Sequence, residues 1–204
     1  MGDKVDLTET LDGYRARRGQ FRTVDLPPSR YLAIDGSGDP NTSQRYQHAL
    51  ETLYPVAYAA KFASKAAGRD YVVPPLEGLW WADDMASFTM ARDKSRWHWT
   101  LLILLPEWID GAAVAAAVAK AAAKDPPLLA DLRIEELSEG RCVQTLHVGS
   151  FDDEAPVLAR MHDEVIPGLG LRMTGRHHEI YLSDARRTAP ERLRTILRQP
   201  VAPA

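Results

Sequence analysis

The side chains best suited to chemistry lie in one alternating stretch near the end of the sequence, residues 177–183 (HHEIYLS). Alternate residues of a strand point to opposite faces of its sheet. We therefore expect Ile180 and Leu182 to face the helices, and Glu179 and Tyr181 to face a ligand cleft. A carboxylate in a water-poor cleft pairs strongly with a cation or activates a water, which a phenol can orient. Glu179 and Tyr181 are thus the candidate catalytic residues. The alternatives are a solvated glutamate on an edge strand and a tyrosine that only packs.

Aromatic side chains that could line such a cleft occur on two predicted strands. Four of the five tryptophans are Trp80, Trp81, Trp97 and Trp99. Flat aromatic walls combined with one carboxylate hold planar and cationic ligands. Strand alternation places Trp97 and Trp99 on one face and separates Trp80 from Trp81. We expect at least two of the four to line the cleft and the rest to pack in the core.

Two further polar side chains are candidates for the same ligand site. Glu77 lies in a stretch that matches the one around Glu179, so it could supply a second carboxylate. The alternative, a surface glutamate on an edge strand, is equally compatible with the sequence. His147 is also included as a ligand-binding candidate. No metal site is predicted, because His177 and His178 are adjacent in a strand and point to opposite faces.

The composition excludes several classes of partner. The chain has 204 residues, of which 45% are hydrophobic and 26% charged, as expected for one globular domain. Its net charge of -3 gives no electrostatic basis for binding nucleic acid or an anionic membrane. The polar N-terminus and the single cysteine, Cys142, predict a cytoplasmic protein with a buried, unreactive thiol. No nucleotide-binding or acyl-enzyme motif occurs, so no cofactor is expected.

Hydrophobic periodicity predicts the elements that must position these residues. Strands are expected at 30–36, 76–82, 95–105, 141–151 and 177–183, with turn residues at Asp83-Asp84 and 91–94. Helices are expected from 41 or 42 to about 68, at 111–124, after the acidic residues 152–154, and at 190–197. Pro55 lies inside the first helix and predicts a kink or a break there. Residues 1–25 are predicted to form a polar arm with a possible helical turn, and the arginines near the C-terminus a solvated basic tail.

The order of these elements repeats. YLAIDGSGDP (31–40) matches TLHVGSFDDE (145–154), and LEGLWWAD (76–83) matches HEIYLSD (178–184). This repeat predicts an α+β fold of two pseudo-symmetric strand–helix–strand–strand units on one antiparallel sheet. We expect helices on one face and the ligand cleft on the other. The whole chain, 1–204, is expected to form a single domain with halves at about 20–108 and 109–204.

Four segments carry a resemblance to a known family. PPLEGLWW (74–81), RDKSRWHWTLLILLP (92–106), LHVGSFDDE (146–154) and GRHHEIYLSDARR (175–187) resemble the stand-alone GyrI-like proteins. These are relatives of the effector-binding domains of multidrug-sensing transcription activators. The resemblance implies a tandem strand–helix–strand–strand fold and an aromatic cleft with a buried glutamate that faces a lipophilic cation. Some stand-alone members hydrolyse the cyclopropane ring of DNA-alkylating natural products.

We therefore expect a protein that binds a planar, hydrophobic and often cationic aromatic compound, as a monomer or homodimer. A bolder expectation is a cyclopropanoid hydrolase that gives detoxification or antibiotic self-resistance, with Glu179 acting on water. The alternatives are a non-catalytic multidrug-binding sensor or sequestering protein, and a gyrase-inhibitor-like protein that contacts a partner protein.

Overall fold

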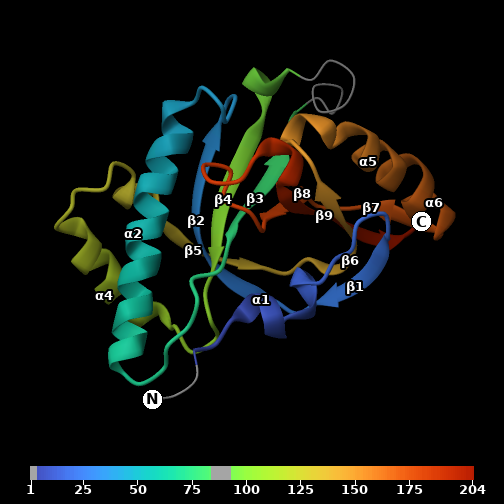
Figure 1. Cartoon of the computed structure of the whole chain (residues 1–204). Helices are drawn as coiled ribbons and strands as arrows, with labels where there is room; N and C mark the ends of the chain where they lie inside the picture. The colour runs from blue at the N-terminus through green and yellow to red at the C-terminus, as the bar shows by residue number, and fades with distance from the viewer. Residues whose placement is uncertain (1–3, 84–92) are drawn as a thin grey trace.

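The computed structural model describes residues 4–83 and 93–204, and its centre is a nine-stranded sheet (Figure 1). The strands are β1 (Arg22–Leu26), β2 (Ser29–Ser37), β3 (Leu76–Trp81), β4 (His98–Leu104), β5 (Arg133–Leu137), β6 (Gly140–Val148), β7 (Leu171–Met173), β8 (His177–Tyr181) and β9 (Arg194–Pro203). The helices are α1 (Leu7–Thr10), α2 (Gln44–Ala66), α4 (Gly111–Ala122), α5 (Ala155–Ala159), the π-helix η5 (Arg160–Val165) and α6 (Ile166–Gly168). Short 3-10 turns are η1 (Asp12–Tyr14), η2 (Lys94–Arg96), η3 (Leu129–Asp131), η4 (Phe151–Asp153) and η6 (Pro190–Arg192).

The sheet consists of two similar units, and this confirms the predicted α+β class. The strands lie in the order β1-β6-β9-β8-β3-β4-β2-β5, with β7 paired to β9, and the described pairings between strands are antiparallel. The first unit is β2-α2-β3-β4, and the second is β6-α5-η5-α6-β8-β9. The units meet at the centre of the sheet, where β3 pairs with β8 and Gly78 lies opposite Glu179.

Each unit also receives an edge strand from the other part of the chain. β1, at the start of the chain, pairs with β6 of the second unit, whereas β5, which precedes β6, pairs with β2 of the first unit. Neither edge strand was predicted from the sequence, and β7 was not predicted either. The two units are therefore joined at the centre and at both edges of the sheet.

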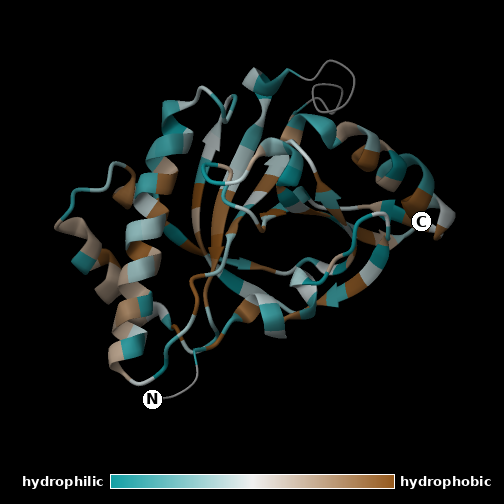
Figure 2. Cartoon of the chain, viewed as in Figure 1, coloured by the Kyte–Doolittle hydropathy of each residue, from teal (hydrophilic) through white to brown (hydrophobic). Residues whose placement is uncertain are grey.

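Both helical layers cover one face of the sheet. α2 begins at Ser43, whose hydroxyl accepts a hydrogen bond from the Tyr46 N–H. Its apolar side packs on alternate residues of β2 and β4, and α4 packs outside it. On the second unit, Met161 and Ile166 are buried against the alternate strand residues Val143, Leu197 and Val201. Figure 2 shows the apolar residues gathered along these strands and the inward sides of the helices.

α2 differs from its prediction at Pro55, because the helix runs unbroken from Gln44 to Ala66. Proline removes one backbone hydrogen bond. Leu53 and Val56, on either side of it, are fully buried, so packing holds the helix where propensity alone would break it.

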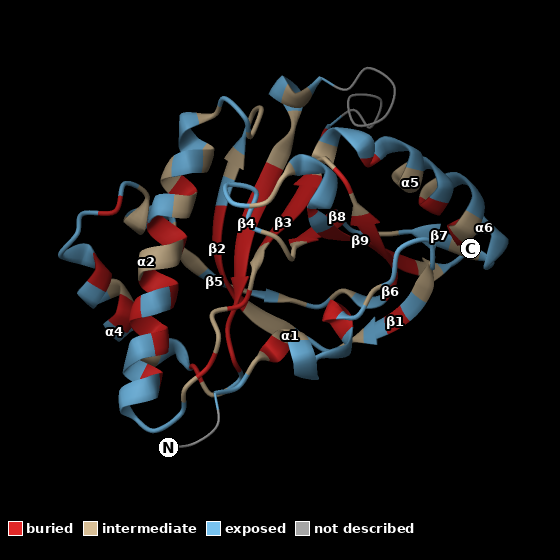
Figure 3. Cartoon of the chain, viewed as in Figure 1, coloured by how far each residue is buried: buried red, intermediate tan, exposed pale blue. Residues whose placement is uncertain are grey.

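The N-terminal segment covers the opposite face. Leu7 and Tyr14 pack there on the sheet residues Leu102, Ile180 and Ile196. Figure 3 shows buried positions at and beside α1. Residues 4–26 thus form α1, η1 and β1. The possible helical turn is present as α1, but the segment packs on the sheet and does not form an arm. Ile180 lies under this segment and not under the helices, which corrects the predicted direction of the two faces of β8.

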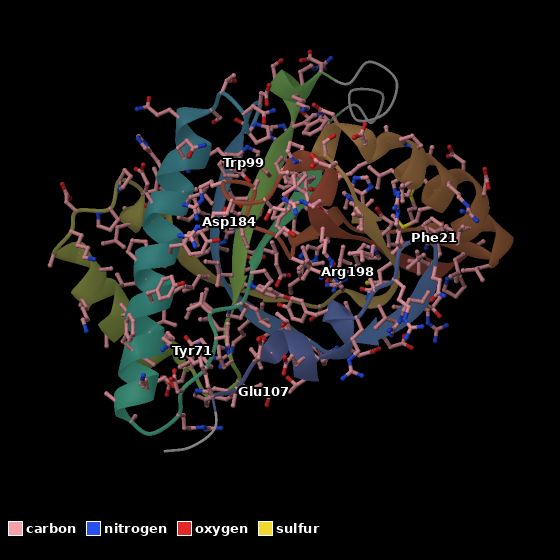
Figure 4. The ribbon with its side chains drawn as sticks, in the orientation of Figure 1. Phe21, Tyr71, Trp99, Glu107, Asp184 and Arg198 are labelled. Carbon is pink, nitrogen blue, oxygen red and sulfur yellow. The ribbon has the colours of Figure 1, made fainter. Side chains whose placement is uncertain are left out.

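The C-terminus holds the largest correction to the predicted elements. Residues 190–197, predicted as a helix, form only the turn η6 before β9 begins at Arg194. Arg198 is 4% exposed and is not part of a solvated basic tail. It donates to Gly13 O at 2.7 Å and to Glu139 Oε2 at 3.0 Å (Figure 4).

Two further sequence predictions concern Cys142 and the turn between β3 and β4. Cys142 is fully buried, and burial raises the pKa of its thiol to about 12. Asp84 and residues 91–92, predicted as turn residues, lie outside the described part of the chain. Within residues 4–83 and 93–204, no helix has the length and apolar character that a membrane crossing requires.

Candidate ligand-binding site

A cavity of about 1760 Å³ lies on the helical face of the sheet, over the junction of the two units. One wall is α2 with Tyr46, Leu50 and Tyr54; the other is the α5–η5 segment, and the floor includes residues of β3 and β8. We had placed the cleft on the face opposite the helices, and that placement is wrong. The helices instead stand apart over the centre of the sheet, as Figure 1 shows, and they form the sides of the cavity.

A chain of hydrogen bonds holds Glu179 at the cavity floor. The Trp80 indole N–H donates to the Tyr181 hydroxyl at 2.9 Å, and that hydroxyl donates to Glu179 Oε2 at 2.8 Å. The second carboxylate oxygen, Oε1, lies 3.5 Å from His177 Nε2. All four residues line the cavity, and Glu179 is only 9% exposed. One carboxylate oxygen, Oε2, is therefore held by the Tyr181 hydroxyl, and the other, Oε1, lies near His177.

Gly78 makes room for this chain. A Cβ at Gly78 would come within 2.7 Å of the Trp80 Nε1 and 3.0 Å of the Tyr181 hydroxyl. Real side chains do not approach so closely, so only glycine permits both rings to lie over this point of β3. Because Gly78 is also the strand partner of Glu179, the gap lies beside the carboxylate.

The phenols around Glu179 are held in their neutral form. Burial, followed by the charge of Glu179, raises the pKa of Tyr181 well above its usual value. The same two causes raise the pKa of Tyr46 on α2. Both hydroxyls thus stay protonated at any physiological pH and act as hydrogen-bond donors near the carboxylate.

Aromatic rings surround the carboxylate. Tyr46 stacks with Trp80 at a centroid distance of 6.4 Å, and Trp97 meets Trp80 edge-on at 5.8 Å. Phe151 meets Tyr181 edge-on at 5.6 Å. These rings come from β3, β8, α2 and the segments before β4 and after β6, and all of them line the cavity. The arrangement offers flat apolar surfaces on several sides of one buried carboxylate.

The other two candidate tryptophans have different surroundings. Trp99 is fully buried, packs edge-on under Tyr46 at 5.2 Å, and covers Gly36, where any Cβ would meet its ring (Figure 4). It belongs to the core beneath the site and does not line it. Trp81 contributes to the cavity lining, but its ring stacks on His98 at a centroid distance of 5.6 Å. The Arg176 guanidinium lies over the Trp81 ring, 3.8 Å from its centroid.

Glu77 does not join Glu179, which corrects the proposed pair of carboxylates. In the β3–β8 register, Glu77 lies opposite Ile180, so its side chain points to the face under the N-terminal segment. There it accepts a hydrogen bond from the Tyr14 hydroxyl and lies 2.9 Å from His178 Nε2. The residue of β3 that pairs with Glu179 is Gly78, so β3 brings no carboxylate to this point.

A buried ion network surrounds Glu77. His178 Nδ1 lies 2.9 Å from Glu139, whose other oxygen accepts a hydrogen bond from Arg198. Although burial opposes the charge, Glu139 and Glu77 raise the pKa of His178 to about 9. Burial raises the pKa of Glu139, but His178 and Arg198 outweigh it and lower the value to about 2. The network attaches the N-terminal segment to the sheet, and its charged residues Glu77, His178, Glu139 and Arg198 do not line the cavity, although Tyr14 does.

His147, the remaining candidate, also lies away from the cavity. Its Nε2 is 2.9 Å from the Ser150 carbonyl, and the ring packs against Gly149. It shapes the turn that follows β6.

Several cavity residues were not singled out from the sequence. They are Tyr46, Leu50 and Tyr54 on α2, Phe151 and Glu154 before α5, His162 on η5, and Met173 and His177 near β8. One of them, Glu154, belongs to the acidic residues 152–154 that precede the predicted helix, and it is buried and lines the cavity. Among the described residues, no group of three or more metal-ligating side chains is arranged to hold an ion.

Comparisons with known proteins identify the family and the fold. A family model described as the GyrI-like small molecule binding domain matches residues 19–202. An uncharacterised conserved protein from Listeria innocua is 35% identical, with a TM-score of 0.87, over 98% of this chain and 100% of its own. A protein described as a hydrolase, also from Listeria innocua, is 34% identical over the same shares, with a TM-score of 0.83.

A more distant structure shares the fold only. The C-terminal domain of EcmrR is 11% identical, with a TM-score of 0.53, over 91% of this chain and 98% of that domain. A search of the curated proteins found no match.

Proposed function

The chain belongs to the GyrI-like family of small-molecule-binding domains, and from this premise we propose that it binds planar, hydrophobic and often cationic aromatic compounds. The observation that carries the proposal is the Glu179 carboxylate, held by Tyr181 and Trp80 at the floor of an aromatic cavity. Aromatic faces stack on flat ligands, and a poorly solvated carboxylate favours a ligand with positive charge.

We further propose that the ligands include cyclopropane-bearing DNA-alkylating compounds, which the protein hydrolyses. The oxygen of a water molecule bonds to a ring carbon, and the adjacent ring C–C bond breaks. The electron pair of that bond passes to the conjugated carbonyl oxygen. Glu179 takes a proton from the water and later releases it to solvent, while the enolate oxygen takes a proton from solvent, so the net change is the addition of one water. The similarity to a protein described as a hydrolase supports an activity of this kind.

The hydrogen bonds around Glu179 favour one role for Tyr181. Its proton is already donated to Glu179 Oε2, and its own oxygen accepts from Trp80. In this arrangement Tyr181 orients the carboxylate and leaves Oε1 to receive the proton of the attacking water. Other hydrogen-bond donors of the cavity then stabilise the negative charge that develops on the carbonyl oxygen of the substrate.

The direct test is to incubate the protein with a cyclopropane-bearing DNA alkylator and follow the addition of water by mass spectrometry. The wild type should form the hydrated, ring-opened product faster than solvent does. Glu179→Gln should lower that rate by about 10²–10⁴-fold, which is typical for the loss of a general base. Its unfolding temperature should be retained, because the amide keeps the shape of the side chain and removes a buried charge.

Glu107→Gln is a matched control, because Glu107 is exposed and is not among the residues that line the cavity (Figure 4). It should hydrolyse as the wild type does. Tight binding of the alkylator without any product would contradict the enzyme proposal and would favour a sensor or sequestering protein.

A further inference from the structure

Two imidazole rings meet inside the cavity, next to Glu179. His177 on β8 and His162 on η5 both line the cavity, and their rings lie edge to face at a centroid distance of 6.1 Å. His177 is only 6% exposed. Neither ring has a role in the hydrogen-bond chain from Trp80 to Glu179.

Three nitrogens of these two rings are buried without a hydrogen-bond partner in the described part of the protein. They are His162 Nε2 and both ring nitrogens of His177. The 3.5 Å between His177 Nε2 and Glu179 Oε1 is too long for a good hydrogen bond. Buried polar atoms in native proteins are nearly always paired, so three unpaired nitrogens at one point suggest groups that await a partner.

Other buried histidines of the chain show the contrast. Both nitrogens of His178 lie 2.9 Å from carboxylates, and His147 Nε2 lies 2.9 Å from a carbonyl oxygen. His178 Nε2 also lacks a hydrogen bond of good geometry, but the Glu77 carboxylate lies 2.9 Å away and forms an ion pair with it. The carboxylate next to His177 Nε2, that of Glu179, lies farther away at 3.5 Å.

The local backbone supports the same conclusion. His162 lies in the π-helix Arg160–Val165, a rare conformation that is frequently found at functional sites. The π-helix places Met161 in the core and the next residue, His162, at the cavity.

We propose that His162 and His177 form a second polar subsite of the cavity, which binds a carbonyl oxygen on the edge of a planar aromatic ligand. The inference rests on the proposed binding function and specifies its ligand. Each imidazole carries an N–H in either tautomer, and one carbonyl oxygen can accept two hydrogen bonds. The aromatic rings around Trp80 hold the face of such a ligand, and the two histidines hold its polar edge.

The charge state of His162 agrees with a neutral partner. Burial and the neighbouring His177 lower the pKa of His162 to about 4. Its ring is uncharged at neutral pH, so it suits a dipole such as a carbonyl better than an anionic ligand.

Two probes of the same tricyclic shape test the subsite. Acridone carries a ring carbonyl, and acridine does not. The wild type should bind acridone more tightly than acridine, by about fivefold for each hydrogen bond gained. His177→Phe and His162→Phe should each reduce this preference and leave the affinity for acridine within about twofold. His177→Gln and His162→Gln serve as second variants if a phenylalanine impairs folding.

His48→Phe is the control, because His48 lies on α2 outside the cavity lining. Its acridone preference should equal that of the wild type. The subsite proposal would be overturned if both histidine variants kept the preference for acridone. It would also be overturned if the wild type showed no such preference.

A third probe, the cation rhodamine 6G, separates this result from the proposed function. If rhodamine 6G binding depends on Glu179 but the preference for acridone does not depend on the two histidines, only the subsite proposal is overturned. If none of the three probes binds, both proposals are overturned.

Discussion

At the scale of single residues, β8 supplies polar groups to both faces of the sheet. Glu179 and His177 face the cavity, while His178, between them, faces the ion network under the N-terminal segment. Strand alternation alone produces this division. A carboxylate for a ligand and an imidazolium for the structure can therefore be adjacent in sequence and remain separate in function.

The network around His178 predicts a specific pH dependence of stability. The pKa of His178 is raised from 6.5 to about 9, so its contribution is complete below 6.5 and is lost as the pH rises through 9. The pKa of Glu139 is lowered from 4.5 to about 2, so its contribution is complete above 4.5 and is lost as the pH falls through 2. The network should thus stabilise the fold most between about pH 4.5 and 6.5.

Urea unfolding across this range measures the effect. The free energy of unfolding of the wild type should decline as the pH rises from 6.5 toward 9. The double variant Glu77→Gln/His178→Gln removes the imidazole and one of its two carboxylate partners, and it should lose most of that decline. If the free energy of unfolding of the double variant declines as steeply with rising pH as that of the wild type, another group controls the decline.

At the scale of elements, strand β3 depends on the absence of a side chain at Gly78. Gly78→Ala places a methyl group against Trp80 and Tyr181 in the middle of the hydrogen-bond chain. We expect Trp80 to move, the Tyr181 contact to break, and the affinity for planar cations to fall about tenfold or more, which corresponds to about 1.4 kcal/mol. A dye titration of the variant checks this. Gly168→Ala is the control, because a Cβ there meets nothing within 4 Å. Equal affinities of the two variants would contradict the role of Gly78.

Much of this element structure could be predicted from periodicity. β2, β3, β6, β8 and α4 lie within about three residues of their expected limits, because each carries a clear apolar pattern between turn residues. β9 was missed because its side chains resemble a helical tail, and because Pro200 argues against a central strand. The structure accepts Pro200 because the pairing of β9 with β8 ends at Arg198, so no hydrogen bond to β8 is lost.

The site was harder to predict than the strands. Alternation shows which side chains share a face, so it grouped Glu179 with Tyr181 and separated Trp80 from Trp81. It cannot show which face carries the cavity, because both faces of this sheet are covered. Tyr46 and His162 lie on helices whose position over the sheet depends on tertiary packing, and local pattern contains little of that information.

At the scale of the whole molecule, the two units share one sheet and exchange edge strands. β1 crosses to the second unit and β5 to the first, while β3 and β8 join them at the centre. Neither unit therefore has a complete sheet by itself. The ligand cavity exists only at this junction, because α2 and the α5–η5 segment come from different units.

This connectivity predicts cooperative unfolding. Tryptophan fluorescence reports mainly on the first unit, where Trp80, Trp81, Trp97, Trp99 and Trp108 all lie, whereas far-ultraviolet circular dichroism reports on both units. The two signals should give the same midpoint in urea, as a two-state transition requires. Two separate midpoints would mean that the units are independent domains.

The most direct test of the account is a titration of the protein with rhodamine 6G, followed by tryptophan quenching and by equilibrium dialysis. We predict saturable binding by the wild type and by Glu107→Gln, and a loss of at least about tenfold in affinity for Glu179→Gln, since a desolvated charge pair contributes more than the ~0–1 kcal/mol of an exposed one. A neutral planar probe, acridine, should bind wild type and Glu179→Gln alike. If Glu179→Gln binds rhodamine 6G as tightly as the wild type does, Glu179 is not the centre of the site.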